Sequence, residues 1–190
     1  MARPLSEDKH NAILAAAAEA IAALGMGAPT ARIAAGAGVA EGTLFTYFPT
    51  KDVLFNKLYL ALKQEVAATL MAGYPVSSPL KVRWRHVWDR YIDWGAAHCA
   101  KRKAIRQLTV SDRIGEPFRK SGNEAFRDIY ALMDESVAAG AMTKQPPAFV
   151  AAIFEALADT TMEFVAREPD AHDRYRSAGF EALWGGAFNP

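Results

Sequence analysis

A tight turn between two very short helical stretches is the feature that most limits how this chain can fold. Within residues 33–55, Gly38 supplies backbone freedom for the turn, a second short stretch follows at 41–47, and Pro49 stops it. Two helices this short cannot bury a core alone, so other helices must pack before and after them. The arrangement leaves one short helix protruding with small and hydroxyl side chains outward. That is the plan of a helix-turn-helix, whose second helix enters the major groove of DNA.

The rest of the chain also follows a helical pattern. Apolar residues recur at steps of three and four, and β-branched alternation is scarce. This periodicity predicts an all-α protein of about nine helices. We expect them near residues 6–24, 29–36, 41–47, 51–72, 79–98, 101–110, 121–139, 147–167 and 170–185.

The clearest linker is the segment 73–79, which contains Gly73, Pro75 and Pro79. It suggests a head at residues 1–48, a connector helix at 50–72 and a separate helical domain at 79–190. We use the name head for residues 1–48 throughout.

Composition limits the class of protein. Of the 190 residues, 51% are hydrophobic and 23% are charged, which predicts a globular chain with a real core. The single Cys99 excludes an internal disulfide and a cysteine-based metal site. No apolar run approaches the roughly 18 residues of a membrane span, and the first residues carry no secretory pattern. We therefore expect a cytoplasmic protein with no membrane partner.

The net charge is only +1, but it is unevenly distributed. Residues 1–60 hold five basic and five acidic side chains, which counts against strong non-specific affinity for nucleic acid. A specific reader remains possible if the bases lie on one face, namely Arg3, Lys9, Arg32 and Lys51. Further along, Lys101, Arg102, Lys103 and Arg106 form a basic cluster. We favour a solvated turn for this cluster over attraction of DNA phosphates or an acidic effector.

Five spaced elements carry a family resemblance. They are Ile33-Ala34, Ala37-Gly38-Val39, Gly42-Thr43-Leu44-Phe45, Tyr47-Phe48 and Lys51-Asp52 with Leu54. In this register they resemble the TetR/AcrR family of bacterial repressors over about residues 8–60. The resemblance implies an N-terminal three-helix helix-turn-helix DNA-binding domain, followed by a helical ligand-binding and dimerisation domain. It also implies DNA contacts by Thr30, Gly42, Thr43, Phe45, Thr46, Tyr47 and Lys51.

The chemistry of these residues is consistent with such contacts. Gly42 and Thr43 lack bulk, so the start of their helix can approach base edges closely. Tyr47 can donate its hydroxyl to a phosphate, and Lys51 stands in a first helical turn whose free N–H groups also attract an anion. Glu41 occupies a position where a base-reading residue is expected. Its carboxylate can accept from cytosine N4 but repels nearby phosphates.

A stripe of aromatic residues marks the helix expected at 79–98. Trp84, Trp88, Tyr91 and Trp94 are spaced by four, three and three, so they lie largely on one face. A core role is favoured for such a stripe. The alternative is a ligand pocket, because several indole N–H groups need partners and other helices supply facing apolar groups. The further candidate lining residues are Phe126, Tyr130, Met133, Phe154 and Met162.

The last two expected helices carry more apolar surface than one core stripe requires. By resemblance to the family, these helices pair with those of a second copy in a four-helix interface, and a two-fold dimer is the commonest closed assembly. The candidate interface residues are Phe149, Ile153, Leu157, Thr161, Phe164, Phe180, Leu183 and Trp184.

Together these features predict a ligand-responsive dimeric transcriptional regulator. The favoured form is a repressor that binds a palindromic operator and is released by a small hydrophobic or aromatic effector. An enzyme is disfavoured, because the four histidines are far apart without metal-ligand spacing and no glycine-rich phosphate loop exists; we predict no catalytic residue, metal or cofactor. The second alternative is a helical small-molecule-binding or interaction protein with a weak or vestigial DNA-binding head. The neutral charge of residues 1–60 and the presence of Glu41 favour that alternative.

Overall fold

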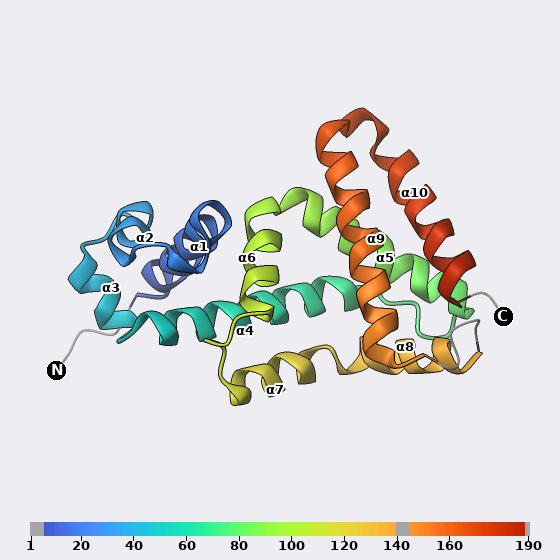
Figure 1. Ribbon diagram of the computed structural model, residues 1–190, viewed down its shortest axis with the longest axis horizontal. Helices are drawn as coiled ribbons and strands as arrows, with labels where there is room; N and C mark the ends of the chain where they lie inside the picture. The colour runs from blue at the N-terminus through green and yellow to red at the C-terminus, as the bar shows by residue number, and fades with distance from the viewer. Residues whose placement is uncertain (1–5, 140–144, 189–190) are drawn as a thin grey trace. The chain divides into compact units, whose positions relative to one another are not determined.

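The computed structural model describes residues 6–139 and 145–188, and within these ranges the regular structure is entirely helical (Figure 1). Three short turns of 3-10 or π-helix follow α1, precede α10 and follow α10. The α-helices of the described residues are α1 (Glu7–Leu24), α2 (Thr30–Gly36), α3 (Glu41–Tyr47), α4 (Lys51–Met71), α5 (Leu80–Ala97), α6 (Cys99–Thr109), α7 (Glu116–Ala125), α8 (Arg127–Ala139), α9 (Pro147–Arg167) and α10 (His172–Leu183).

The all-α prediction is confirmed, with one helix more than expected. The helix predicted over 121–139 is two helices, α7 and α8, with Phe126 as a turn residue between them. Pro117, which falls between the helices expected at 101–110 and 121–139, lies inside the first turn of α7. Proline is tolerated there because the first N–H groups of a helix have no intrahelical partner.

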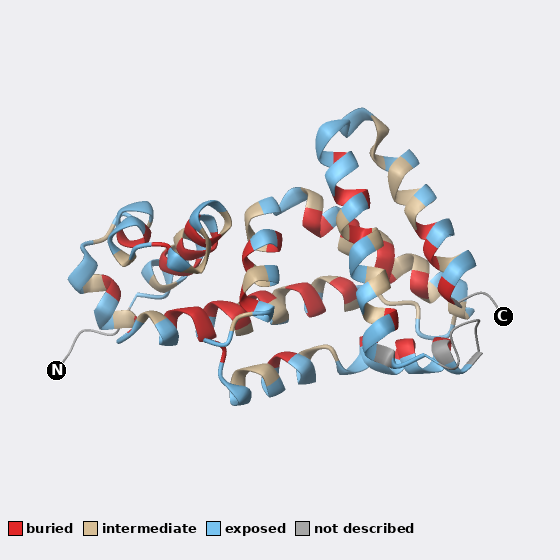
Figure 2. Cartoon of the chain, viewed as in Figure 1, coloured by how far each residue is buried: buried red, intermediate tan, exposed pale blue. Residues whose placement is uncertain are grey.

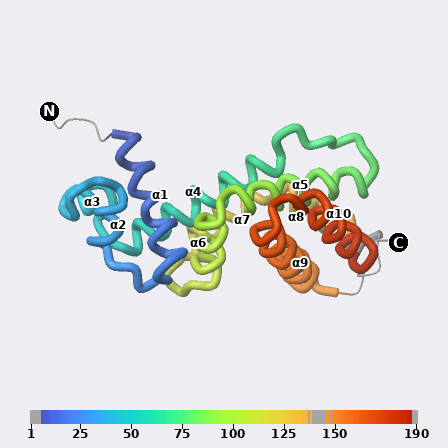
Figure 3. The backbone as a smooth tube through the Cα atoms, turned by 90° about the horizontal axis from the view of Figure 1, so that it is seen from above, coloured from blue at the N-terminus to red at the C-terminus, as the bar shows by residue number. Residues whose placement is uncertain are grey.

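The chain forms two compact units. The first contains residues 1–65 and 98–125, and the second contains 66–97 and 126–190. This grouping by contact differs from the division predicted around 48 and 79, because α6 packs along α1 (Figure 3). Ala104 and Leu108 of α6 are buried in one hydrophobic core with Ile13 and Ile21 of α1.

The first unit has a core in which every helix takes part. Ser6 caps α1 by accepting from the Lys9 N–H, and Gln107 of α6 donates to the carbonyl of Ile21 near the other end of α1, at 3.1 Å.

One stretch of the described residues, Glu7–Gly27, is long and apolar enough to cross a membrane by length and composition. Ile13, Ala17 and Ile21 of this stretch are buried in the core of the first unit, whereas Leu24 is 51% exposed.

A buried amide fastens the turn between α6 and α7 onto α4. Asn56 is 7% exposed, and its side-chain nitrogen donates to the carbonyls of Asp52 (2.7 Å) and Arg113 (3.0 Å). Its side-chain oxygen accepts from the Gly115 N–H at 2.8 Å. Buried polar groups are stable when their bonds are satisfied. The Asn56 side chain therefore bonds two residues of this turn, Arg113 and Gly115, to α4.

In the second unit, α5, α9 and α10 pack around two tryptophans. Trp84 and Trp88 are fully buried, and the Phe154 ring lies 5.8 Å and 5.6 Å from theirs. The Trp84 indole donates to the Ser136 hydroxyl, and the Trp88 indole donates to the carbonyl of Arg176 at 2.7 Å. Figure 2 shows buried residues on both α9 and α10. The aromatic stripe thus belongs to the core, the favoured interpretation of the sequence.

Gly179 sets the approach of α10 to α5 and α9. A Cβ atom built on Gly179 would lie 2.6 Å from Cζ2 of Trp88 and would also clash with the Thr161 hydroxyl. Gly179 therefore allows α10 to pack closely against α5 and α9 of the same chain.

We predict that Gly179→Ala destabilises the fold by about 1–3 kcal/mol, because the methyl group forces a fully buried indole or the helices to move. Chemical denaturation would measure the change. Gly185→Ala is the matched control, since nothing lies within 4 Å of a Cβ at that position. Equal stability of the two variants would show that the crossing is not as tight as described.

Candidate DNA-binding surface and pocket

The turn between α2 and α3 has the geometry of a helix-turn-helix. Gly38 has a φ of 67°, a backbone conformation that L side chains rarely adopt. The Val39 N–H donates to the carbonyl of Ala34 at 3.0 Å, which closes the turn. Leu44 and Phe48 are 0% and 1% exposed, so they anchor α3 in the core of the first unit.

The opposite face of α3 is open. Four of its predicted contact residues are exposed and two are half-buried. At Gly42, a built Cβ would meet nothing within 4 Å, so packing within the chain does not require a glycine there. Because Gly42 has no side chain, the backbone of the first turn of α3 is accessible from outside. The exposed residues are Glu41, Gly42, Phe45 and Thr46, and the half-buried ones are Thr43 and Tyr47.

Two predicted contact residues are bound to each other. The Thr30 hydroxyl donates to Oε1 of Glu41 at 2.5 Å, joining the start of α2 to the start of α3. The sequence pattern placed both residues at the surface but gave no sign of this pair. The bond orients the Glu41 carboxylate toward α2, which reduces its freedom to meet phosphates elsewhere.

Tyr47 connects the end of α3 to the beginning of α1. Its hydroxyl oxygen accepts from the Ser6 N–H at 2.9 Å. A hydroxyl that accepts one bond still has its own proton to donate. Beside it in sequence, Thr46 donates to the Gly42 carbonyl at 3.0 Å, one turn back along α3.

Lys51 lies in the first turn of α4, which is capped by Thr50 through the Val53 N–H at 3.1 Å. Its ammonium group is 5.2 Å from the centre of the Phe55 ring. Burial lowers the pKa of Lys51, and the neighbouring Arg113 guanidinium lowers it further, against the opposing effect of Asp52. An anion placed here would relieve this repulsion.

Sequence reasoning missed Arg113. Its guanidinium is 5.6 Å from the centre of the same Phe55 ring and forms an ion pair with Asp52 at 3.0 Å. The residue lies in the turn that Asn56 holds on α4. Nothing in the local pattern around residue 113 indicates this neighbourhood, because it depends on a contact with a distant segment.

The other basic side chains are dispersed. Arg32 and Lys9 are exposed, whereas Arg3 lies outside the described residues. In the cluster near residues 101–106, Lys101 pairs with Glu65 at 2.8 Å and Arg102 is only 8% exposed. A solvated turn therefore does not describe Arg102, which is buried in the first unit.

The predicted aromatic pocket residues divide between core and surface. Trp84, Trp88, Trp94 and Met162 are buried, and Phe154 packs against the first two. Tyr91 stacks with Trp94 and contacts Phe154, and Phe126 contacts Tyr130.

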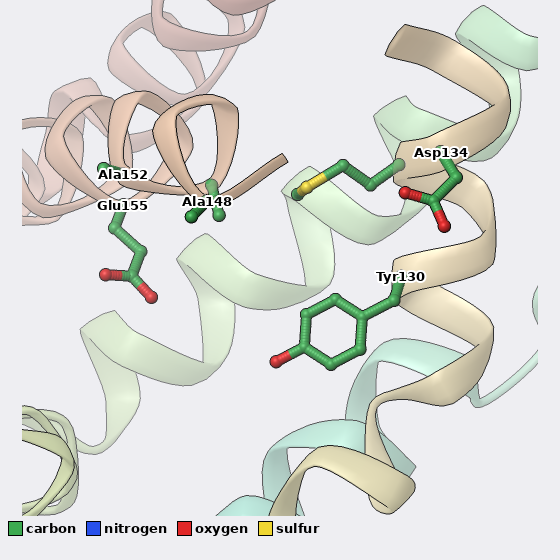
Figure 4. Close-up of a pocket in the computed structure, with 7 residues that line it drawn as sticks. Tyr130, Asp134, Ala148, Ala152 and Glu155 are labelled. Carbon is green, nitrogen blue, oxygen red and sulfur yellow. The ribbon is translucent and has the colours of Figure 1, made fainter. Parts of the chain in front are cut away.

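A pocket of about 400 Å³ lies between α8 and α9, open to solvent on one side. Figure 4 shows Tyr130 and Asp134 on α8 facing the residues of α9. Only Tyr130 and Met133 of the predicted pocket residues line it. The full lining is Tyr130, Met133, Asp134, Ala148, Ala151, Ala152 and Glu155.

The predicted interface residues differ in burial: some are exposed, some are half-buried and some are buried. Phe149 and Phe164 are 51% and 39% exposed. The side chains of Ile153, Leu157 and Trp184 are half-buried. Thr161, Phe180 and Leu183 are buried in the chain's own second unit.

The described residues contain no group of three or more His, Cys, Asp or Glu side chains placed to hold a metal ion. The four histidines serve local contacts. His86, for example, lies 3.1 Å from the Leu70 carbonyl near the end of α4.

Comparison with known proteins gives the same fold and motif. Residues 13–58 match the family model of bacterial regulatory proteins, tetR family. A Shewanella sp. PV-4 protein assigned to the TetR family of transcription regulators is 26% identical, with a TM-score of 0.79 over 93% of this chain and 96% of its own. A TetR-family transcription regulator from Marinobacter aquaeolei VT8 is 17% identical, with a TM-score of 0.80 over 97% of each chain.

A third solved structure is the TetR-like regulator LfrR from Mycobacterium smegmatis, in complex with proflavine. It is 21% identical, with a TM-score of 0.70 over 95% of this chain and 97% of its own. The family match covers α3 and its supporting helices, and the shared fold extends along nearly the whole chain. Residues 13–58 therefore carry the helix-turn-helix motif of the tetR family of bacterial regulatory proteins, and the fold is that of TetR-family transcription regulators.

Proposed function

We propose that this protein is a dimeric, ligand-responsive repressor that acts in the cytoplasm on a palindromic operator. The observation that carries the proposal is the outer face of α3. Its inner residues are fixed in the core, while the surface around Gly42 is open and has no packing role within the chain. A helix of this kind fits the major groove of DNA.

The proposed DNA contacts follow from the geometry. Gly42 and Thr43 approach base edges, and Phe45 meets a thymine methyl group. Tyr47 and Lys51 bind phosphates, with Arg113 beside Lys51 as an additional positive charge. Thr30 and Glu41 act as a pair, and the Glu41 carboxylate accepts from cytosine N4.

We assign the dimer interface to the outer face of α9 with the end of α10. Phe149 and Phe164 expose large aromatic surfaces there, with Ile153 between them. A second copy related by a two-fold axis would cover them. Two heads on half-sites one helical turn apart, roughly 34–36 Å, would bind together far more tightly than one head alone.

The effector is a small hydrophobic or aromatic molecule bound by the second unit. LfrR, a protein of the same fold, has been solved with proflavine, an aromatic compound. Helix α4 belongs to the first unit up to residue 65 and to the second from residue 66, so it connects the two covalently. An effector that prefers one arrangement of α4 would change operator affinity, with a coupling of roughly 1–3 kcal/mol.

Selection of bound sequences from random duplexes is the direct test of the function. The expected product is a palindrome whose half-sites are separated by one helical turn. A purified dimer that selects no sequence, and binds no DNA upstream of its own gene, would favour the alternative of a binding protein with a vestigial head.

We predict that Gly42→Ala lowers operator affinity about tenfold or more while leaving the fold intact. The added methyl group enters open space in the free protein, but it blocks close approach to base edges. Gel-shift titration and thermal unfolding would measure the two effects. Gly27→Ala is the control, because a Cβ there also meets nothing within 4 Å. Unchanged operator binding by Gly42→Ala would mean that the groove does not face this turn.

Lys51→Gln should weaken binding to all sequences alike and make binding less dependent on salt. One phosphate contact fewer per head reduces the slope of log K against log salt by about 0.9 per head. Titrations at several salt concentrations would measure this slope. Lys120→Gln, an exposed lysine on α7, is the charge-matched control. The same slope for wild type and Lys51→Gln would remove Lys51 from the interface.

The double variant Phe149→Asp, Phe164→Asp should be a folded monomer at micromolar concentration, because it places four charges in a two-fold interface. Sedimentation velocity would measure its state. Val76→Asp serves as the control, since Val76 is 72% exposed and lies outside α9 and α10. A double variant that remains dimeric would locate the interface elsewhere.

A further inference from the structure

The α8–α9 pocket is acidic. Its lining includes the carboxylates of Asp134 and Glu155 and contains no lysine or arginine. The remaining lining is a tyrosine, a methionine and three alanines. A neutral hydrophobic ligand would gain nothing from two carboxylates at its edges, whereas a cation would gain from both.

The neighbouring carboxylates of α8 are paired, but Asp134 is not. Glu135 accepts two hydrogen bonds from Arg83, which lower the pKa of its carboxyl, and Asp128 lies 3.6 Å from Arg127. Among the residues that the structure describes, Asp134 has neither an ion pair nor a hydrogen bond. Within the described residues, α8 therefore presents one carboxylate without an ion pair, that of Asp134, at the pocket.

The spacing of the lining places an aromatic ring close to this charge. Tyr130 and Asp134 are one turn apart on α8, and Tyr130 is 39% exposed (Figure 4). Across the pocket, Ala148 and Ala152 are one turn apart on α9, and Glu155 follows on the same face. The small alanine side chains leave room for a flat ligand. A volume near 400 Å³ is in the range of sites for drug-sized molecules.

We infer that this pocket binds an organic cation that carries an aromatic or similarly flat apolar group. The charged end lies between Asp134 and Glu155, and the ring contacts Met133 and the alanines of α9. Tyr130 supplies a ring face to the cation, an attraction that is strongest where water is displaced. That this ligand is the effector rests on the proposed function. Binding of the ligand to the pocket does not require DNA.

The test compares two ligands with the same three-ring skeleton, one cationic and one neutral, on the protein free of DNA. Proflavine is a cationic three-ring compound, and acridine has the same rings and is uncharged at mildly alkaline pH. Fluorescence titration should show proflavine binding at least tenfold more tightly than acridine, with an affinity that falls as salt is added. Asp134→Asn should weaken proflavine binding about two- to fivefold, and the double variant with Glu155→Gln about tenfold.

Asp128→Asn is the matched control, because it removes one carboxylate from the same helix outside the pocket. Its proflavine affinity should equal that of the wild type, and all variants should unfold at similar denaturant concentrations. Equal binding of proflavine and acridine, or equal proflavine binding by the wild type and the double variant, would overturn the inference. Operator titrations on the same variants, without dye, keep this outcome separate from failure of the proposed function.

Discussion

The structure of the first unit depends on the burial of one short helix. Helix α3 covers only Glu41–Tyr47, well below the roughly 12–15 residues at which an isolated helix becomes even marginally stable in water. Its conformation is therefore maintained by packing, above all by Leu44 and by Phe48 just beyond its end. Because the inner side chains fix the rotation of α3, they also fix which residues point outward. Core packing and the choice of DNA-facing residues are thus one constraint.

The supporting core extends beyond the three helices of the head. Helix α6 buries Ala104 and Leu108 against α1, and Asn56 of α4 binds the turn that follows α6. A shift of this turn relative to α4 would break the two hydrogen bonds that the buried Asn56 amide forms with Arg113 and Gly115, or would carry α4 with it. Buried polar groups left without partners cost about 1–3 kcal/mol each, so movement together is favoured. Through Asn56, α4 and the turn after α6 are therefore expected to move together within the first unit.

Periodicity and turn residues were sufficient to predict the helices and the glycine turn, because both signals are local. The division of 121–139 into α7 and α8 was missed, since a continuous apolar pattern does not reveal that its two halves join different units. The stripe of Trp84 and Trp88 was located on one face, but periodicity cannot distinguish a core face from a pocket face. The pair Thr30–Glu41 and the position of Arg113 depend on contacts between distant segments. Such contacts leave no trace in one sequence.

Under the proposed function, the charge balance of residues 1–60 favours binding by two copies. Residues 1–60 carry equal numbers of basic and acidic side chains, so counterion release contributes little for one head. The Thr30 bond to Glu41 reduces the repulsion expected from an acid in the groove but supplies no attraction to phosphates. Affinity must then come from shape at α3, from Lys51 with Arg113, and from linking two heads at a suitable separation. In the proposed regulator, a small change in that separation would release the operator, because each head alone would bind its half-site weakly.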